Sequence, residues 1–130
     1  MNTEGEWIQI AKVEDLKTTK SRECFLEHID YPDWPVSLML LEKEGEYFCY
    51  LNKCPHAGHP LNLERDKFLG PEESDIICRS HGARFSIDTG ECFFGPCVDK
   101  SLIGLKIKVE SECIFLSDSD FTQKAERFIF

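Results

Sequence analysis

Cys54-Pro-His-Ala-Gly58 and Cys78-Arg-Ser-His-Gly82 are the two stretches of sequence that decide the fold and the chemistry of this chain. Each contains one cysteine and one histidine, whose sulfur and nitrogen atoms bind metals. Each also contains glycine, and the first contains proline, both of which favour tight turns. The two stretches therefore predict two loops that hold one metal centre between them through four ligands: Cys54, His56, Cys78 and His81.

The segments around these loops have the hydrophobic period of β-strands. Apolar residues alternate with polar ones in residues 7–10, 47–51 and 105–109. Further short apolar runs occupy residues 23–29, 36–41, 75–78, 84–87 and 113–117. Turn-forming residues separate these runs at 31–35, 44–45, 70–71, 88–90 and 95–96. Many short strands with frequent turns predict an all-β fold, either an antiparallel β-sandwich or a small barrel.

The length of 130 residues predicts a single domain, residues 1–130, with a core of about residues 7–118. The polar segment 61–74 is expected to be a surface loop or to contain a helical turn. An Asp-Ser-Asp cluster at 118–120 opens the C-terminal tail, residues 119–130, and is typical of a helix cap. We expect the apolar side chains of the tail to pack on the same domain, with partner binding as the alternative: Phe121, Phe128, Ile129 and Phe130.

The charge of the chain is strongly acidic, because 15 basic and 24 acidic residues give a net charge of −9. This balance argues against nucleic acid, whose phosphates require basic surface. It fits brief docking on a basic partner, and it fits equally a charge that only keeps the protein in solution. The longest apolar run, residues 36–41, is too short to cross a bilayer, and the acidic N-terminus lacks the pattern of a secretion signal. We therefore expect no membrane association and a cytoplasmic location.

Seven cysteines are many for a chain of this length. The predicted metal centre uses two, and the five that remain are an odd number, so they cannot all pair within one chain. Cys24, Cys49 and Cys113 lie in apolar, strand-like sequence, where a buried thiol acts as a small hydrophobe. Thiols that stay reduced indicate a reducing compartment.

The unequal spacing, C-x-H in the first stretch and C-x-x-H in the second, resembles the signature of the Rieske iron–sulfur proteins. The flanks extend the resemblance through residues 54–61 and 78–85, and Asp88-Thr-Gly90 and Gly95-Pro96 look like the family's turn and its proline loop. The resemblance implies a Rieske-type antiparallel β-sandwich with a cluster-binding subdomain made of two ligand loops. It also implies one [2Fe-2S] cluster per chain, with cysteines on one iron and histidines on the other: Cys54 and Cys78, and His56 and His81.

The chain departs from the family's usual pattern in the length between its two ligand stretches. Residues 57–77 separate His56 from Cys78, several more than the family usually has, and the extra length is expected in residues 64–75. A longer loop there leaves the ligands in place and alters the surface near the cluster.

The resemblance also implies a low reduction potential. High-potential relatives carry a bracing disulfide where this chain has His59 and Ser80, and hydroxyl donors where it has Ala83 and Phe85. Without these donors the reduced cluster is less stabilised, so we expect a midpoint near the low end of the Rieske range, roughly −150 mV. A midpoint above roughly +100 mV would contradict this assignment.

A small, acidic, low-potential Rieske protein resembles the ferredoxins that carry electrons from a flavin-dependent reductase to a terminal oxygenase. We expect a monomeric electron carrier, not an enzyme, with the histidine ligands as the electron exit. The alternatives are a small Rieske subunit of a larger oxidoreductase, and a zinc-binding or redox-sensing regulatory module. A terminal oxygenase on this chain alone is excluded, because only His28 and His59 remain for a second iron site.

Two further residues near the motifs have open roles. His59 is interpreted as an exposed polar side chain, with docking or proton-linked chemistry as the alternative. Cys97 follows the proline loop and is interpreted as a free thiol, with pairing to Cys92 as the alternative.

Overall fold

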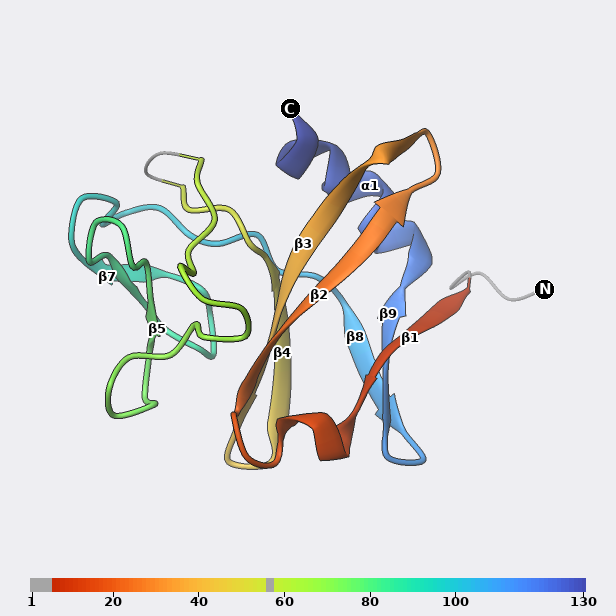
Figure 1. The fold of residues 1–130 in the computed structure, drawn as a ribbon, viewed down its shortest axis with the longest axis horizontal. Coiled ribbons are helices and arrows are strands. Elements are labelled where there is room, and N and C mark those ends of the chain that lie inside the picture. Colours follow the sequence, from red (N-terminus) through yellow and green to blue (C-terminus); the bar gives the residue numbers. More distant parts are fainter. Residues whose placement is uncertain (1–5, 56–57) are drawn as a thin grey trace.

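In the computed structural model, which describes residues 6–55 and 58–130, the chain forms three antiparallel sheets of three strands each (Figure 1). The strands are β1 (Trp7–Lys12), β2 (Ser21–His28), β3 (Tyr31–Lys43), β4 (Glu46–Leu51), β5 (Ile76–Ile77), β6 (Arg84–Phe85), β7 (Cys92–Phe94), β8 (Ile107–Glu110) and β9 (Cys113–Ser117). A 3-10 helix, η1 (Val13–Leu16), and one α-helix, α1 (Asp118–Ile129), complete the described elements. The predicted all-β class is confirmed.

Two of the sheets form the base of the molecule, on the right in Figure 1. Their strand orders are β1-β9-β8 and β2-β3-β4. Backbone hydrogen bonds join β4 to the segment that leads into β8, from Leu51 N–H to the Ile103 carbonyl (2.9 Å) and from Leu105 N–H to the Cys49 carbonyl (2.8 Å). The base therefore surrounds one hydrophobic core, to which both sheets and α1 contribute.

The third sheet, β5-β6-β7, lies on the left in Figure 1 within the chain that connects β4 to β8. Its strands have only two or three residues each, so they supply few ladder hydrogen bonds. A second hydrophobic core supports this part, and its largest fully buried members include Phe68, Phe85 and Leu61. We call residues 52–102 the loop subdomain, because both predicted ligand loops lie in it.

Strand β3 belongs to both cores. Its side chains at positions 36, 38 and 40 enter the base core, and those at 39 and 41 enter the core of the loop subdomain. Successive side chains of a strand point to opposite faces, so the sheet β2-β3-β4 is a wall between two cores. This explains why residues 36–41 read as a nearly uninterrupted apolar run and not as an alternation.

The prediction of a turn at residues 31–35 is wrong, because β3 begins at Tyr31. The ladder with β2 pairs His28 with Tyr31 and then shifts register before Leu26 pairs with Val36. The exposed residues between these pairs, two of them prolines, stand opposite no residue in the ladder register. Proline lacks an N–H group, so it is tolerated where a strand makes no ladder hydrogen bond.

Two other segments add detail that the hydrophobic pattern did not contain. Strand β7 was not predicted, since its three residues are too few to show a period and two of them, Phe93 and Phe94, are exposed. Residues 61–74 form an irregular segment without a helix. Most of its side chains are exposed, as a surface loop predicts, whereas Leu61, Phe68 and Leu69 are buried.

The tail forms α1, as its opening cluster predicts. Ser117 is the N-cap, and its hydroxyl accepts from the Asp120 N–H at 3.3 Å. Phe121 and Ala125 are buried in the base core, so the tail packs on its own domain, whereas Phe130 is 76% exposed. Neither α1 nor any other helix within residues 6–55 and 58–130 has the length and apolar character needed to span a bilayer.

Candidate metal centre

The first predicted ligand loop leaves the end of β4 and closes on itself with two backbone hydrogen bonds. The Cys54 N–H donates to the His59 carbonyl at 2.7 Å, and the Gly58 N–H donates to the Cys54 carbonyl at 2.8 Å. Gly58 has φ +73°, in the left-handed region that glycine adopts without strain. His56 and Ala57 lie outside the described residues. The described part of the loop is therefore a tight turn that begins at the cysteine.

The second predicted ligand loop joins β5 to β6 and closes in the same way. The Cys78 N–H donates to the Ala83 carbonyl at 2.8 Å, and the Gly82 N–H donates to the Cys78 carbonyl at 2.8 Å. Gly82 has φ +74°, nearly the value of its counterpart in the first loop. Next to the loop, the guanidinium of Arg84, the first residue of β6, contacts the largely buried carboxylate of Asp75, just before β5, at 3.1 Å. Two stretches with different sequence spacing thus share the same closing hydrogen bonds and nearly the same glycine φ.

The two loops place their cysteines inside the protein and the described histidines outside. Cys54 and Cys78 are both fully buried, whereas His81 and His59 are exposed. The rings of His59 and His81 lie 6.3 Å apart between centroids, so the tips of the loops are neighbours. The exposed position of His59 agrees with its interpretation as a surface side chain. Both cysteines lie in the buried core of the loop subdomain, His81 lies at the tip of the second loop, and the fourth predicted ligand, His56, lies outside the described residues.

A buried polar network holds the first loop, and sequence reasoning missed it. Its centre is Asn52, which is fully buried two residues before the first cysteine. The Asn52 side-chain oxygen accepts from the Leu61 N–H at 2.8 Å, and its amide group donates to Asn62 at 2.9 Å and to the Ser37 hydroxyl at 3.0 Å. The Glu23 carboxylate accepts from Ser37 at 2.6 Å and from Asn62 at 2.9 Å. The network therefore ties the first loop to strands β2 and β3.

One backbone contact extends this support to the second loop. The Leu61 carbonyl accepts from the Arg79 N–H at 2.8 Å, so the chain just after the first loop is bonded to the residue just after Cys78. The Leu61 side chain is fully buried in the core of the loop subdomain. Both loops are therefore connected through Leu61, and this connection fixes the position of one loop relative to the other.

A third loop, residues 95–97, contacts the second predicted ligand loop. Gly95 has φ +99°, and a Cβ atom there would lie 2.8 Å from the Cα atom of Ala83. Only glycine allows so close an approach of two backbones. This loop contains the predicted proline loop, Gly95-Pro96, and it reaches the second ligand loop through backbone atoms.

Cys97 ends the third loop and lies beside another thiol. Its Sγ atom is 3.1 Å from the Sγ atom of Cys92, and both side chains are buried. Burial raises the pKa of Cys97 to about 12, with further contributions from the thiols of Cys92 and Cys54. None of the seven cysteines, all within the described residues, forms a disulfide. The predicted free state of Cys97 agrees with this, and the alternative partner, Cys92, is in contact with it.

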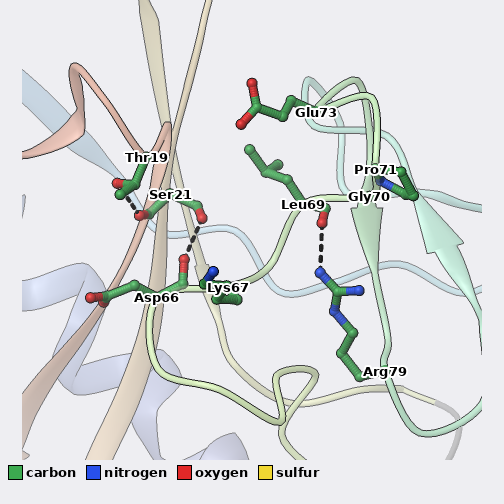
Figure 2. A pocket seen from close by; sticks show the side chains of 9 residues that line it. All are labelled: Thr19, Ser21, Asp66, Lys67, Leu69, Gly70, Pro71, Glu73 and Arg79. Carbon is green, nitrogen blue, oxygen red and sulfur yellow. Dashed lines mark hydrogen bonds between the residues drawn. The ribbon is translucent and has the colours of Figure 1, made fainter.

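The longer connection between the ligand loops lies against the edge of the base. The Asp66 carbonyl accepts from the Ser21 hydroxyl at 2.6 Å, and its carboxylate accepts from the Glu23 N–H at 2.7 Å. Figure 2 shows the cavity of about 290 Å³ that this segment encloses with β2 and with Arg79 of the second loop. The Arg79 guanidinium donates to the Leu69 carbonyl at 2.9 Å. This segment therefore lies along the edge strand β2 and accepts a hydrogen bond from Arg79 of the second loop.

Helix α1 borders the other side of the first loop. The Lys53 ammonium donates to the Arg127 carbonyl at 2.6 Å, at the C-terminal end of the helix. A cavity of about 250 Å³ lies between Arg127 and the loop residues Cys54, Pro55 and Gly58. The tail, which showed only a helix cap in the sequence, thus reaches the residue next to a predicted ligand.

The donor set fits an iron–sulfur cluster with mixed ligands. Cysteine thiolates bind the iron atoms of such clusters, and in the Rieske type two histidines replace two of the four cysteines. Here two buried thiols stand at the bases of the loops and an exposed imidazole stands at the tip of the second. Within residues 6–55 and 58–130, no three side chains among histidine, cysteine, aspartate and glutamate gather around a point where one metal ion would bind.

Comparison with known proteins gives a family and a fold. Residues 6–111 match the family model of the Rieske [2Fe-2S] domain. Apoptosis-inducing factor 3 from Homo sapiens and from Mus musculus are each 30% identical over 121 residues, which cover 91% of this chain and 17% of theirs. The chain therefore spans about a sixth of the length of these curated relatives.

Solved structures with the same fold include two bacterial ferredoxins. The ferredoxin of carbazole 1,9a-dioxygenase from Nocardioides aromaticivorans IC177 has a TM-score of 0.65 and 20% identity, over 87% of this chain and 98% of the ferredoxin. The ferredoxin of Sphingomonas yanoikuyae B1 has a TM-score of 0.66 and 20% identity, over 86% and 98%. A plasma membrane Rieske protein of the cyanobacterium Synechocystis PCC 6803 has a TM-score of 0.57 and 21% identity, over 84% and 97%.

Proposed function

The chain belongs to the Rieske [2Fe-2S] domain family and binds one such cluster, and from this premise we propose that it is a one-electron carrier. The observation that carries the proposal is the pair of loops with the same backbone closure, whose histidine-bearing tips lie side by side. A bound cluster supplies reversible one-electron chemistry. We propose as its ligands the two cysteines and two histidines of the loops: Cys54, His56, Cys78 and His81.

The proposed cysteine ligands are buried, whereas the described histidine ligand, His81, is exposed. Cys54 and Cys78 are fully buried, so their sulfur atoms face the interior and away from water. His81 is exposed, so an electron leaving through this imidazole has no protein layer to cross before it reaches a docked partner. The closed loop backbones hold these side chains without relying on a disulfide, and this fits the absence of cysteine at His59 and Ser80.

We propose that the partners are a reductase and an oxygenase. The support is structural similarity to oxygenase-system ferredoxins, including one solved in complex with the oxygenase of carbazole 1,9a-dioxygenase (TM-score 0.65, 16% identity). The net charge of −9 fits transient docking on basic surfaces. The proposed carrier is a monomer of one domain, is not itself an enzyme, and works in the cytoplasm. The support for a reducing compartment is that none of its seven cysteines forms a disulfide.

A second candidate role follows from the length of the curated relatives. This domain corresponds to 17% of them, so it is a small part of a larger protein there. The same domain would then serve as a Rieske subunit held permanently by a larger oxidoreductase. Size-exclusion chromatography of the native protein distinguishes the two roles, because a shuttle elutes alone and a subunit elutes in a stoichiometric complex.

The ligand proposal is tested by His81→Ala, with His59→Ala as the matched control. The rings of both residues are exposed and lie 6.3 Å apart, so loss of either has a similar effect on the surface. We expect His81→Ala to abolish the rhombic Rieske EPR signal of the dithionite-reduced protein and His59→Ala to keep it. Iron, sulfide and zinc are counted on the same samples.

Three outcomes of this experiment contradict the proposal. A normal signal in His81→Ala removes this residue from the ligand set. One zinc and no iron in the anaerobically purified native protein replaces electron transfer by a structural or regulatory site. A native midpoint above roughly +100 mV rejects the low-potential carrier but keeps the cluster.

A further inference from the structure

The thiol pair Cys92–Cys97 has no part in the proposed ligand set, yet it is placed for chemistry of its own. The two Sγ atoms lie 3.1 Å apart, and a disulfide bond measures about 2.05 Å. Bond formation therefore requires the sulfur atoms to approach by about 1 Å.

The backbone around the pair holds the two residues together. The Cys92 N–H donates to the Lys100 carbonyl at 2.9 Å, and the Lys100 N–H donates to the Cys97 carbonyl at 2.9 Å. Cys92 is also paired with Phe85 in the ladder between β6 and β7. Both cysteines are thus fixed through one shared residue, so their contact is a property of the folded backbone and not of two mobile side chains.

We propose that Cys92 and Cys97 form a redox-active dithiol, which a low-molecular-weight disulfide such as oxidised glutathione converts into an intramolecular disulfide. One thiol, as its thiolate, attacks glutathione disulfide and releases one glutathione. The second thiol then attacks the mixed disulfide and releases the other. The protein loses two electrons and two protons, and one glutathione disulfide becomes two glutathione thiols.

The site is reached through the third loop. Cys97 is fully buried and Cys92 is 6% exposed, while the residues between them and the next one, Val98, are exposed. Oxidant therefore gains access when this short surface segment opens. We expect slow exchange, because the buried thiols meet the oxidant only while this segment is open.

Oxidation of the pair acts on the ligand loops through two contacts. The segment between the cysteines contains Gly95, whose backbone lies against Ala83 of the second ligand loop. Cys97 also lies near Cys54, whose thiol contributes to its raised pKa. A disulfide shortens the distance between the sulfur atoms of Cys92 and Cys97, at the two ends of this segment. The backbone of Gly95 then shifts against Ala83 of the second ligand loop. This effect on the cluster rests on the proposed function, whereas formation of the disulfide does not.

Trypsin makes the proposal directly testable on the native holoprotein. Cleavage after Arg84 and after Lys100 releases residues 85–100, which contain both cysteines and no other. Holoprotein is equilibrated with mixtures of reduced and oxidised glutathione until the result is constant. It is then denatured in the presence of iodoacetamide, so that buried free thiols are alkylated, and its tryptic peptides are weighed. The visible spectrum of the cluster is recorded on each sample before alkylation.

We expect the peptide to change from a doubly alkylated form to an unalkylated form that lacks two hydrogens, while the cluster spectrum persists. Cys92→Ser is expected to lose this change and to carry one alkyl group or one glutathione. Peptides that contain Cys24 or Cys113 serve as internal controls and stay alkylated, because these residues lie on β2 and β9 in the base.

Two results overturn the proposal. One is a peptide that stays doubly alkylated in excess oxidised glutathione, even after treatment with the thiol oxidant diamide. The other is a disulfide that forms only after the cluster spectrum has disappeared, since the bond is then a product of cluster loss. The effect on the cluster is measured separately, as a shift of the EPR g-values between dithiol and disulfide forms that Cys92→Ser does not show.

Discussion

The two proposed ligand loops of this protein close with the same hydrogen bonds but are supported by different means. In each loop the cysteine N–H and carbonyl make the closing bonds, and a glycine adopts φ near +74°. The first loop is held by the buried side chain of Asn52, whose oxygen accepts a hydrogen bond from the Leu61 N–H. The second is held from the side by the backbone of Gly95. A single local geometry can therefore rest on a polar network in one place and on close backbone packing in another.

The largest effect should come from breaking the support of the first loop with Asn52→Ala. The substitution leaves the buried Leu61 N–H without its acceptor and removes donors to Ser37 and Asn62. Buried unsatisfied groups cost about 1–3 kcal/mol each, so we expect a loss of about 3–4 kcal/mol in the free energy of unfolding, measured in urea.

The control for this prediction is Asn62→Ala, a half-buried member of the same network that accepts no bond from the loop backbone. We expect it to cost about 1 kcal/mol. Equal losses in the two variants would show that the network stabilises the protein as a whole and does not specifically hold the first loop.

Breaking the support of the second loop with Gly95→Ala should have the next largest effect. The new methyl group would meet the Ala83 backbone at 2.8 Å, at a φ of +99°. Overpacking and left-handed strain together should cost about 2–3 kcal/mol. Gly45→Ala is the matched control, because Gly45 has φ +82° and a methyl group there meets no atom of the described residues within 4 Å. It should cost only about 1 kcal/mol in the free energy of unfolding. If the two variants are equally stable, close packing of Gly95 against the Ala83 backbone does not support the second loop.

The same substitution in both loops sharpens the comparison. Gly58 and Gly82 have nearly equal φ, and a methyl group at either meets no atom of the described residues closer than 3.6 Å. Alanine at each position should therefore cost about 1 kcal/mol, since only the left-handed conformation opposes it. Thermal unfolding of the two variants measures this, and a clearly unequal result would mean that the two closures differ in rigidity.

The smallest effect is expected from Lys53→Met, which separates the first loop from helix α1. Methionine keeps an apolar stem but loses the ammonium group that donates to the Arg127 carbonyl. A cation at a helix C-terminus contributes about 0.3–1 kcal/mol, so we expect a loss near 0.5 kcal/mol that shrinks in high salt. The exposed Lys17→Met serves as control. A stability change that salt does not affect would point to packing and not to charge.

The sequence was sufficient to predict turns at the two proposed ligand loops, because each closes through hydrogen bonds between residues at most five positions apart, such as Cys54 and His59. It did not predict their supports, because these join distant positions. Glu23 and Asn62 meet across 39 residues, and a single asparagine before a motif carries no sign that it is buried. Tertiary contacts of this kind leave no periodic trace in a sequence.

The errors in strand assignment have a similar origin. The prolines at 32 and 35 predicted a turn, but the register shift in the ladder leaves this part of β3 without ladder positions opposite it. β7 escaped notice because three residues show no period, and its place is fixed by pairing with β6. Local rules apply where a strand has a regular ladder, and they fail where a neighbouring strand decides.

The middle of strand β3, residues 36–41, is buried on both faces, and this burial affects how the register of the strand with β2 and β4 is fixed. In a sheet with one wet face, a slip by one residue exposes apolar side chains, and this penalty fixes the register. In β3 a slip would only move leucines from one core to the other. Ser37 is the exception, because its hydroxyl donates to Glu23 at 2.6 Å and its carbonyl accepts from the Asn52 N–H at 2.9 Å. The hydrogen bonds of Ser37, which belong to the network that holds the first loop, thus also select one strand register among several with similar hydrophobic burial.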